Sequence, residues 1–175
     1  FDLLSSFAAL AVWDTMYYLF NIKSSIKWPN DIIFESKKLC GILCEIVNNK
    51  KGKPAYAVVG IGINLEKQEF PDELNQTAGS VADFYNGKID HNEVAIDIIN
   101  NLDRYILRKN VLNIEKTDLF IKLLKERSCI INNDVMIQTG TENFIGKVLD
   151  IAKNGHLIVS KNSEAVELSA GEVVK

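Results

Sequence analysis

The stretch of residues 26–45 constrains this chain more than any other part of it. Two short strand-like runs, residues 32–34 and 39–48, are joined there by a short polar turn. A Trp-Pro-Asn-Asp corner precedes the first run, and in it Pro29 fixes its own φ and keeps Trp28 out of the helical region. The sequence therefore predicts a β-hairpin that the chain enters through a tight corner.

Lysines and turn-forming residues lie at the ends of this hairpin. Lys27 stands before the corner and Lys38 follows the turn, while Asn30 and Asp31 are residue types that close turns through their own backbone. Neighbouring strands lie about 5 Å apart, so the hairpin can bring both ammonium groups to one place with a carboxamide beside them. Such a group suits an anionic substrate, either a phosphate or a carboxylate. The spacing also fits two lysines that point into water, and both interpretations stay open.

A second constraint is the continuous apolar run of residues 55–65, which predicts a central strand covered on both faces. Gly60 and Gly62 share one face of this strand, and glycine there indicates that something approaches the backbone closely. One interpretation is a helix packed over that face, and the other is a flat ligand. Asn64 ends the strand as an isolated carboxamide. Because the glycines lie inside a strand, they do not form a dinucleotide-binding fingerprint.

The composition is that of a soluble globular protein and excludes some kinds of site. The 175 residues are 47% hydrophobic and 25% charged, and their net charge of −3 argues against a general nucleic-acid-binding surface. His91 and His156 have no partners at ligand spacing, so a metal site made by the protein alone is not expected. Cys40 and Cys44 would lie about 13 Å apart on one strand, which is too far for a disulfide. Free, buried cysteines of this kind are typical of a protein in a reducing cytosol.

The rest of the chain alternates helices and strands and ends in a strand-rich segment. Helical periodicity predicts helices at residues 3–20, 80–85, 91–109 and 115–127. The apolar run of residues 7–13 in the first helix is too short for a membrane span and has the wrong flanks for a signal peptide. After Asp134, four short runs alternate with turns such as Asn154-Gly155, which predicts a small closed β-barrel. We therefore expect an α+β fold in two parts, residues 1–128 and 129–175.

Three blocks of the chain together resemble the biotin–protein ligases. The blocks are Lys27-Trp28-Pro29-Asn30-Asp31, Lys37-Lys38-Leu39-Cys40-Gly41-Ile42-Leu43-Cys44-Glu45 and Val59-Gly60-Ile61-Gly62-Ile63-Asn64. They are similar in order and spacing to the family patterns KWPND, K-L-x-G-I-L-x-E and G-x-G-x-N. The segment from Gly146 to Gly171 resembles the small SH3-like barrel at the C-terminus of family members. The resemblance therefore covers nearly the whole chain.

The resemblance implies a fold, an activity and partners. The fold is a mixed sheet with packed helices, similar to the class II aminoacyl-tRNA synthetases, followed by the SH3-like β-barrel. Such ligases join biotin to AMP with ATP, release pyrophosphate, and transfer biotin to a lysine of a biotin carboxyl carrier protein, such as an acetyl-CoA carboxylase subunit. ATP and biotin are the implied substrates, with Mg²⁺ carried by ATP, and the implied location is cytoplasmic. No membrane partner is implied, nor nucleic acid through this part of the chain, and a homodimer is compatible with the family.

The resemblance also implies roles for the residues that match its motifs. Lys38 is expected at the biotin carboxylate and the acyl-phosphate, and Lys27 near the nucleotide phosphates, which makes these two the implied catalytic residues. Asn30 and Asn64 are expected around the nucleotide, with Asn64 at the adenine, whose donor and acceptor a carboxamide can match. Gly41 would leave room for biotin beside Lys38.

One departure from the family shapes the expectations for the whole chain. The Gly- and Arg-rich biotin loop of the family, G-R-G-R-x-G-R, would precede the first helix and does not occur in the sequence, which begins at Phe1. We therefore expect the chain to hold the nucleotide side and half of the biotin pocket, and not to be active alone. Asp31 either assists the metal or only closes the turn, and no other metal ligand is implied.

Two alternatives to a biotin ligase stay open. A lipoate–protein ligase shares the fold and the chemistry, but its motif lacks the Trp28-Pro29 pair. A non-catalytic remnant that serves as a binding module would fit the missing loop, but Lys27, Lys38 and the two asparagines are all present.

Overall fold

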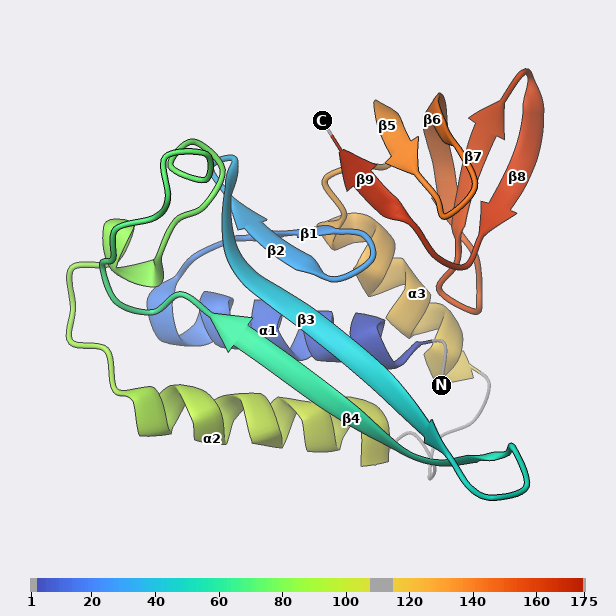
Figure 1. Cartoon of the computed structure of the whole chain (residues 1–175). Coiled ribbons are helices and arrows are strands. Elements are labelled where there is room, and N and C mark those ends of the chain that lie inside the picture. The colour runs from blue at the N-terminus through green and yellow to red at the C-terminus, as the bar shows by residue number, and fades with distance from the viewer. Residues whose placement is uncertain (1–2, 108–114, 175) are drawn as a thin grey trace.

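The computed structural model describes residues 3–107 and 115–174 and has an α+β fold with two antiparallel sheets (Figure 1). The helical elements are α1 (Leu4–Phe20), η1 (Val81–Asp83), α2 (His91–Leu102), the π-helical η2 (Asp103–Leu107) and α3 (Glu115–Arg127). The strands are β1 (Ser25–Lys27), β2 (Asp31–Phe34), β3 (Lys37–Asn48), β4 (Pro54–Ile63), β5 (Asp134–Gln138), β6 (Asn143–Ile151), β7 (Leu157–Lys161), β8 (Glu164–Leu168) and β9 (Glu172–Val174).

The predicted hairpin and the three long helices are present, but the helix predicted at residues 80–85 is only the 3₁₀ turn η1. The predicted helix at 91–109 changes to π-helical geometry after Leu102, and residues 108–109 lie outside the described ranges. None of the helices in the described ranges is long and apolar enough to cross a membrane.

The first sheet has the strand order β1-β2-β3-β4, and each of its ladders is antiparallel. The expected mixed sheet is therefore wrong for the described strands, because short connections join them in sequence and such connections require antiparallel pairing. Parallel pairing occurs only at isolated bridges, from Ile26 to Ser128 and from Lys38 to Ala78, within the ranges that the structure covers. Figure 1 shows α1 behind β3 and β4, with α2 beside α1, so the helices cover one face of the sheet.

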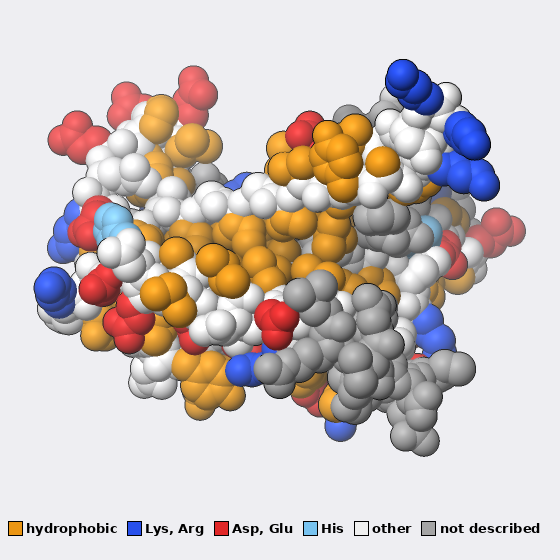
Figure 2. All heavy atoms as spheres, turned by 90° about the horizontal axis from the view of Figure 1, so that it is seen from below, with side chains coloured by type: hydrophobic (Ala, Val, Ile, Leu, Met, Phe, Trp, Pro, Cys, Tyr) orange, Lys and Arg blue, Asp and Glu red, His pale blue; other side chains and the backbone are white. Residues whose placement is uncertain are grey.

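β4 lies at the edge of this sheet among the described strands, although its apolar run predicts a central position. Its residues alternate between exposed and half-buried, and Tyr56 and Val58 are among the exposed ones. The prediction is wrong because an apolar run does not distinguish a strand covered on both faces from one whose open face also carries apolar residues. Figure 2 shows further hydrophobic side chains in the middle of the face seen from below.

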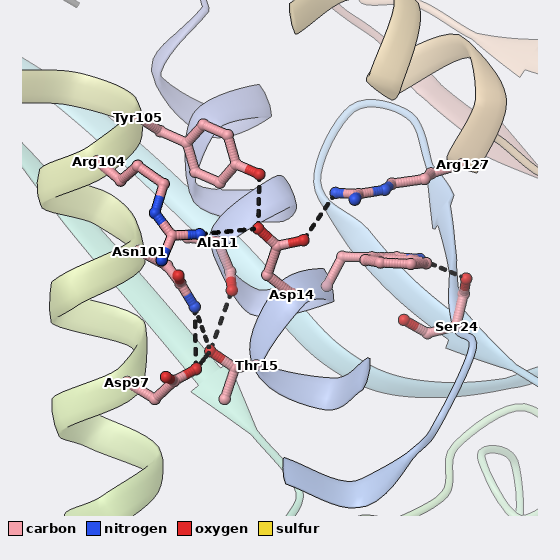
Figure 3. A network of polar contacts seen from close by, with 10 residues as sticks. Ala11, Asp14, Thr15, Ser24, Asp97, Asn101, Arg104, Tyr105 and Arg127 are labelled. Atoms are coloured by element: carbon pink, nitrogen blue, oxygen red, sulfur yellow. Dashed lines mark hydrogen bonds and ion pairs between the residues drawn. The ribbon is translucent and has the colours of Figure 1, made fainter. Parts of the chain in front are cut away.

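α1 is buried along most of its length because apolar residues occupy nearly all of its sides. It ends at Asn21, whose left-handed conformation directs its N–H back to the carbonyl of Tyr17 at 2.9 Å. Asp14 is buried within it, and Figure 3 shows its partners. The Tyr105 hydroxyl donates to Asp14 at 2.6 Å, and Arg127 lies 3.0 Å from the same carboxylate. A buried charge thus links α1 to η2 and α3.

The second sheet has the order β8-β7-β6-β5-β9 and is also antiparallel throughout. The four predicted strand-like runs correspond to β5 to β8, and β9 is an additional strand that the sequence did not reveal. β8 and β9 form the two edges, so the described pairings make an open sheet and the predicted closed barrel is not confirmed.

The two sheets meet at β1 and at the corner that follows it. The N–H of Cys129, just after α3, donates to the carbonyl of Ile26 at 3.1 Å. The indole N–H of buried Trp28 donates to the carbonyl of Gly155 at 3.0 Å, across 127 positions of sequence. Buried side chains from both sheets form one hydrophobic cluster. The motif-bearing corner is therefore fastened to the second sheet.

Candidate functional site

Four motif residues form one row across the first sheet. Lys27 of β1 pairs with Asp31 of β2, Asp31 pairs with Gly41 of β3, and Gly41 pairs with Gly62 of β4. Directly paired residues of antiparallel strands point to the same face of the sheet. The row therefore places a cation, a carboxylate and two glycines on one face, with Lys27 about 10 Å from Gly41 at about 5 Å per strand.

Lys38 reaches this same face through a β-bulge. Lys38 and Gly41 are three positions apart, so in a regular strand their side chains would point to opposite faces. The register between β2 and β3 shifts between Ile32 and Ile33, which leaves Leu39 as the extra residue. The bulge thus turns Lys38 to the face that carries Gly41. No residue pattern in the sequence marks this bulge.

The ammonium of Lys38 lies over Gly41 and pairs with Asp31. Lys38 Nζ is 2.6 Å from Asp31 Oδ1, and the two side chains are 47% and 17% exposed. A Cβ built on Gly41 would lie 3.1 Å from Lys38 Cε and 3.2 Å from Nζ. The space above Gly41 therefore holds the end of the Lys38 side chain. The result is an ordered cation that stays open to solvent.

Asn64 fastens a loop beside Lys38. Its Nδ2 donates to the carbonyl of Gly79 at 3.0 Å and lies 3.5 Å from that of Lys38. The Lys38 N–H donates to the carbonyl of Thr77 at 2.6 Å, and the Gly79 N–H donates back to Lys38 at 3.1 Å. Residues 77–79 therefore run along the backbone of Lys38. The sequence did not reveal this contact, because the segment is polar and irregular and shows no periodicity.

Asn30, the other predicted carboxamide, is bonded to β3. Its Nδ2 donates to the carbonyl of Ile42 at 2.7 Å, and the Ile42 N–H donates to the carbonyl of Asn30 at 2.9 Å. Asn30 and Asn64 therefore both use their nitrogens on backbone carbonyls in or next to β3. Their convergence on one adenine-binding cleft stays a prediction.

Gly60 and Gly62 lie on the face that the helices leave open. A Cβ on Gly60 would approach the carbonyl of Leu43 at 3.7 Å, and one on Gly62 would approach the carbonyl of Gly41 at 3.8 Å, both ordinary contacts. The interpretation that a helix packs over these glycines is therefore wrong, because α1 and α2 cover the other face. The interpretation that a flat ligand lies against this glycine strip stays a prediction.

The described residues of the site provide charged side chains and exposed backbone, and they provide neither an activated nucleophile nor a cluster of metal ligands. Burial is the main cause that raises the pKa of Cys40 to about 12, Asp31 adds to it, and Lys38 opposes it. The Cys40 thiol is therefore protonated at neutral pH. Within the described residues, no group of three or more His, Cys, Asp or Glu side chains could hold a metal ion. Fixed cations beside an open glycine surface suit anionic substrates.

Comparisons with known proteins lead to one family. Residues 2–64 match the biotin/lipoate A/B protein ligase family. The chain is 29% identical, over 98% of its length, to a biotin–[acetyl-CoA-carboxylase] ligase of Mycobacterium tuberculosis, of which it covers 61%. It is 31% identical, over 97% of its length, to the bifunctional ligase/repressor BirA of Bacillus subtilis, of which it covers 52%. The chain thus spans about half to three-fifths of the length of these relatives.

Solved structures show the same fold. A crystal structure of the biotin protein ligase from Aquifex aeolicus matches with a TM-score of 0.82 at 24% identity, over 98% of this chain and 72% of that one. A structure of that ligase in complex with biotin and ATP matches with a TM-score of 0.81 at 23% identity, over 98% of this chain and 69% of that one. The family match and the curated relatives therefore confirm the resemblance to the biotin–protein ligases, and the solved structures share the fold of this chain.

Proposed function

We propose that the protein is a biotin–protein ligase. In the first step, a carboxylate oxygen of biotin attacks the α-phosphorus of ATP, the bond to the β-phosphate oxygen breaks, and pyrophosphate leaves. In the second step, the amine of a carrier lysine attacks the acyl carbon of biotinyl-AMP, AMP leaves, and the amine loses a proton. The carrier is a biotin carboxyl carrier protein, such as an acetyl-CoA carboxylase subunit, and the protein acts in the cytoplasm.

The observation that carries this proposal is the cation of Lys38 above Gly41 on the open face of the sheet. The first step brings two anions together, so a fixed cation is needed to reduce their repulsion and to stabilise the charge of the transition state. Lys38 is ordered by Asp31 yet remains 47% exposed, so a substrate oxygen can reach it. A lysine that extended freely into water would not be placed over a glycine in this way.

The other motif residues take supporting roles in this proposal. Lys27, in the same row as Asp31 and Gly41, binds the nucleotide phosphates. Asn30 and Asn64 border the nucleotide through the oxygens of their carboxamides, since their nitrogens bond to the backbone.

In this proposal the Asp31 carboxylate contacts the Lys38 ammonium and is not a ligand of Mg²⁺. Mg²⁺ usually keeps several waters and binds substrate phosphates, so it would enter this site with ATP. Asp31 Oδ1 lies 2.6 Å from Lys38 Nζ, so this oxygen is already used by a cation. The described residues offer no cluster of carboxylates that would hold the ion independently.

We also propose that the chain consists of two parts with different roles. Residues 1–128 form the catalytic part, because the row of motif residues lies on their sheet. Residues 129–175 form an SH3-like module, supported by the five short antiparallel strands β5 to β9. The hydrogen bond between Trp28 and Gly155 supports a role for this module in holding the corner of the catalytic part.

Biotin-dependent exchange of labelled pyrophosphate into ATP, measured on the complete protein because residues 1–175 are not expected to be active alone, tests the proposal. The expected result is exchange with biotin and none without it, followed by streptavidin-detectable labelling of a purified carrier domain. Exchange with lipoate but not with biotin would identify the lipoate ligase alternative. No exchange with either acid would favour the non-catalytic binding module.

A further inference from the structure

We propose that Asp31 is a positioning residue that holds the Lys38 ammonium above Gly41. We propose further that Gly41, which has no side chain, leaves the space that this ammonium occupies. The inference rests on the proposed function for its kinetic consequences. Its structural part, that Asp31 and Gly41 order Lys38, stands on the geometry alone.

Three observations describe how Lys38, Asp31 and Gly41 are arranged. Lys38 Nζ is 2.6 Å from Asp31 Oδ1, a distance typical of a charge-assisted contact. Asp31 and Gly41 are directly paired across β2 and β3, so the carboxylate is fixed by the sheet itself. The three atoms nearest to a Cβ on Gly41 are Cε and Nζ of Lys38, at 3.1 and 3.2 Å, and Oδ1 of Asp31, at 3.8 Å.

The exposed fractions show which partner directs the other. Asp31 is 17% exposed and lies on a short paired strand, whereas Lys38 is 47% exposed and has four rotatable side-chain bonds. The less mobile carboxylate therefore orders the more mobile ammonium. Without this carboxylate, the Lys38 side chain would sample many rotamers over the open face. Substrate binding would then have to fix the side chain in one rotamer, at a cost in conformational entropy.

Asp31 has two opposing effects on an anionic substrate. Its charge repels the substrate and so weakens ground-state binding, while its contact places the ammonium where charge develops in the reaction. Pre-placed charge accelerates a reaction because no reorganisation is needed at the transition state. Loss of the Asp31 charge should therefore reduce turnover without weakening the binding of biotin.

The kinetic test uses Asp31→Asn, with Glu45→Gln as the matched control on the same face of β3. For Asp31→Asn in the complete protein we expect kcat of biotin-dependent adenylation to fall by up to about 100-fold, the cost of a misplacement of about 1 Å, with KM for biotin unchanged or lower. Glu45→Gln should change neither value, because Glu45 lies four positions, or about 13 Å, from Gly41 along the strand. A raised KM with unchanged kcat for Asp31→Asn would overturn the proposal.

Gly41→Ala provides a second variant that acts on the same ammonium. Its Cβ would face the open side of the sheet, where the three nearest heavy atoms are side-chain atoms of Lys38 and Asp31, so the fold should be kept. We expect the same fall in kcat, and a combined Asp31→Asn/Gly41→Ala variant should lose less than the product of the two single losses, since both act through Lys38. Fully multiplicative losses would count against the shared mechanism.

A measurement without substrate separates this inference from the proposed function. In protein labelled with ¹³C at lysine Cε, Asp31→Asn should lower the NMR order parameter of Lys38 and leave that of Lys37 unchanged. An unchanged Lys38 would overturn the positioning role, even in an active enzyme. A wild-type protein without biotin-dependent exchange would refute the proposed function, while the order parameters would still decide whether Asp31 positions Lys38.

Discussion

Lys37 and Lys38 are adjacent and carry the same charge, but the fold gives them different surroundings. Lys37 Nζ donates to the carbonyl of Asn75, in the loop that precedes residues 77–79. Lys38 lies over Gly41 and pairs with Asp31. The two lysines therefore form a matched pair in which only the surroundings of the ammonium differ.

In the complete protein, Lys38→Ala should slow biotin-dependent pyrophosphate release far more than Lys37→Ala. A hydrogen bond to a charged group is worth about 1.5–3 kcal/mol, which corresponds to a loss of roughly 10- to 100-fold. Lys38→Arg should restore only part of the rate, because a planar guanidinium does not replace a compact ammonium in a tight site. Equal effects of Lys37→Ala and Lys38→Ala would show that Lys38 is an ordinary surface lysine.

Asp14→Asn should destabilise the protein strongly. Asp14 is only 5% exposed and its partner Arg127 16%, so the substitution leaves a buried guanidinium without its counter-charge (Figure 3). Breaking such a pair typically costs about 3–5 kcal/mol of unfolding free energy, measured by urea denaturation. Arg104→Gln is the control, since Arg104 is 57% exposed and 3.9 Å from the same carboxylate, and it should cost at most about 1 kcal/mol.

At the scale of elements, the sequence predicted most helices and strands but not their register. The hairpin was predictable because the Trp-Pro corner and the polar turn act locally. The bulge at Leu39 was not, because a register shift depends on how β2 and β3 pair rather than on either strand alone. The motif identified Lys38 and Asp31 by type, and only the bulge explains why they meet. The edge position of β4 was missed for a related reason, since strand order is not a property of one segment.

Tyr105 of the π-helical turn η2 makes the stability of the protein depend on pH above about 10. Burial and the hydrogen bond to Asp14 raise the pKa of Tyr105 from 10.0 to about 12. Between these values the folded protein keeps a proton that the unfolded chain loses, so the unfolding free energy should fall as pH rises from about 10 to about 12. Urea denaturation at several pH values should show a weaker fall in Tyr105→Phe. Tyr18→Phe is the control, because Tyr18 is 69% exposed, and it should keep the wild-type slope.

At the scale of the whole molecule, the two sheets are parts of one structure. Buried residues of both belong to one hydrophobic cluster. α3 is joined to β6 by the ion pair of Lys125 with Asp150 at 2.8 Å. The hydrogen bond between Trp28 and Gly155 reaches from the motif corner into the turn between β6 and β7. The sequence predicted a boundary near residue 129 from a change of pattern, but a pattern carries no information about contacts across such a boundary.

Trp28→Phe should test how far the motif corner depends on the second sheet. Phenylalanine keeps most of the apolar packing but removes the indole donor, which leaves the buried carbonyl of Gly155 without this partner. The unfolding free energy should fall by about 1–3 kcal/mol. Trp13→Phe is a harder control to interpret, because Trp13 also donates to Ser24 and lies under Arg127. Tyr17→Phe, at the ring that stacks on Trp13, should lower the unfolding free energy less than Trp28→Phe does.

A chain that ends at residue 130 should fold poorly, although it keeps the whole first sheet. Truncation removes the acceptor of the Trp28 hydrogen bond. It also removes the residues of the second sheet from the hydrophobic cluster to which Ile26 of β1 and Leu124 of α3 belong. An exposed apolar area of this kind promotes self-association. Size-exclusion chromatography should show aggregates, and a dye that binds exposed hydrophobic surface should fluoresce more strongly than with the intact chain. A monomeric fragment with a cooperative unfolding transition would instead show that residues 1–130 fold independently, and that the second sheet contributes to the site without stabilising the fold around it.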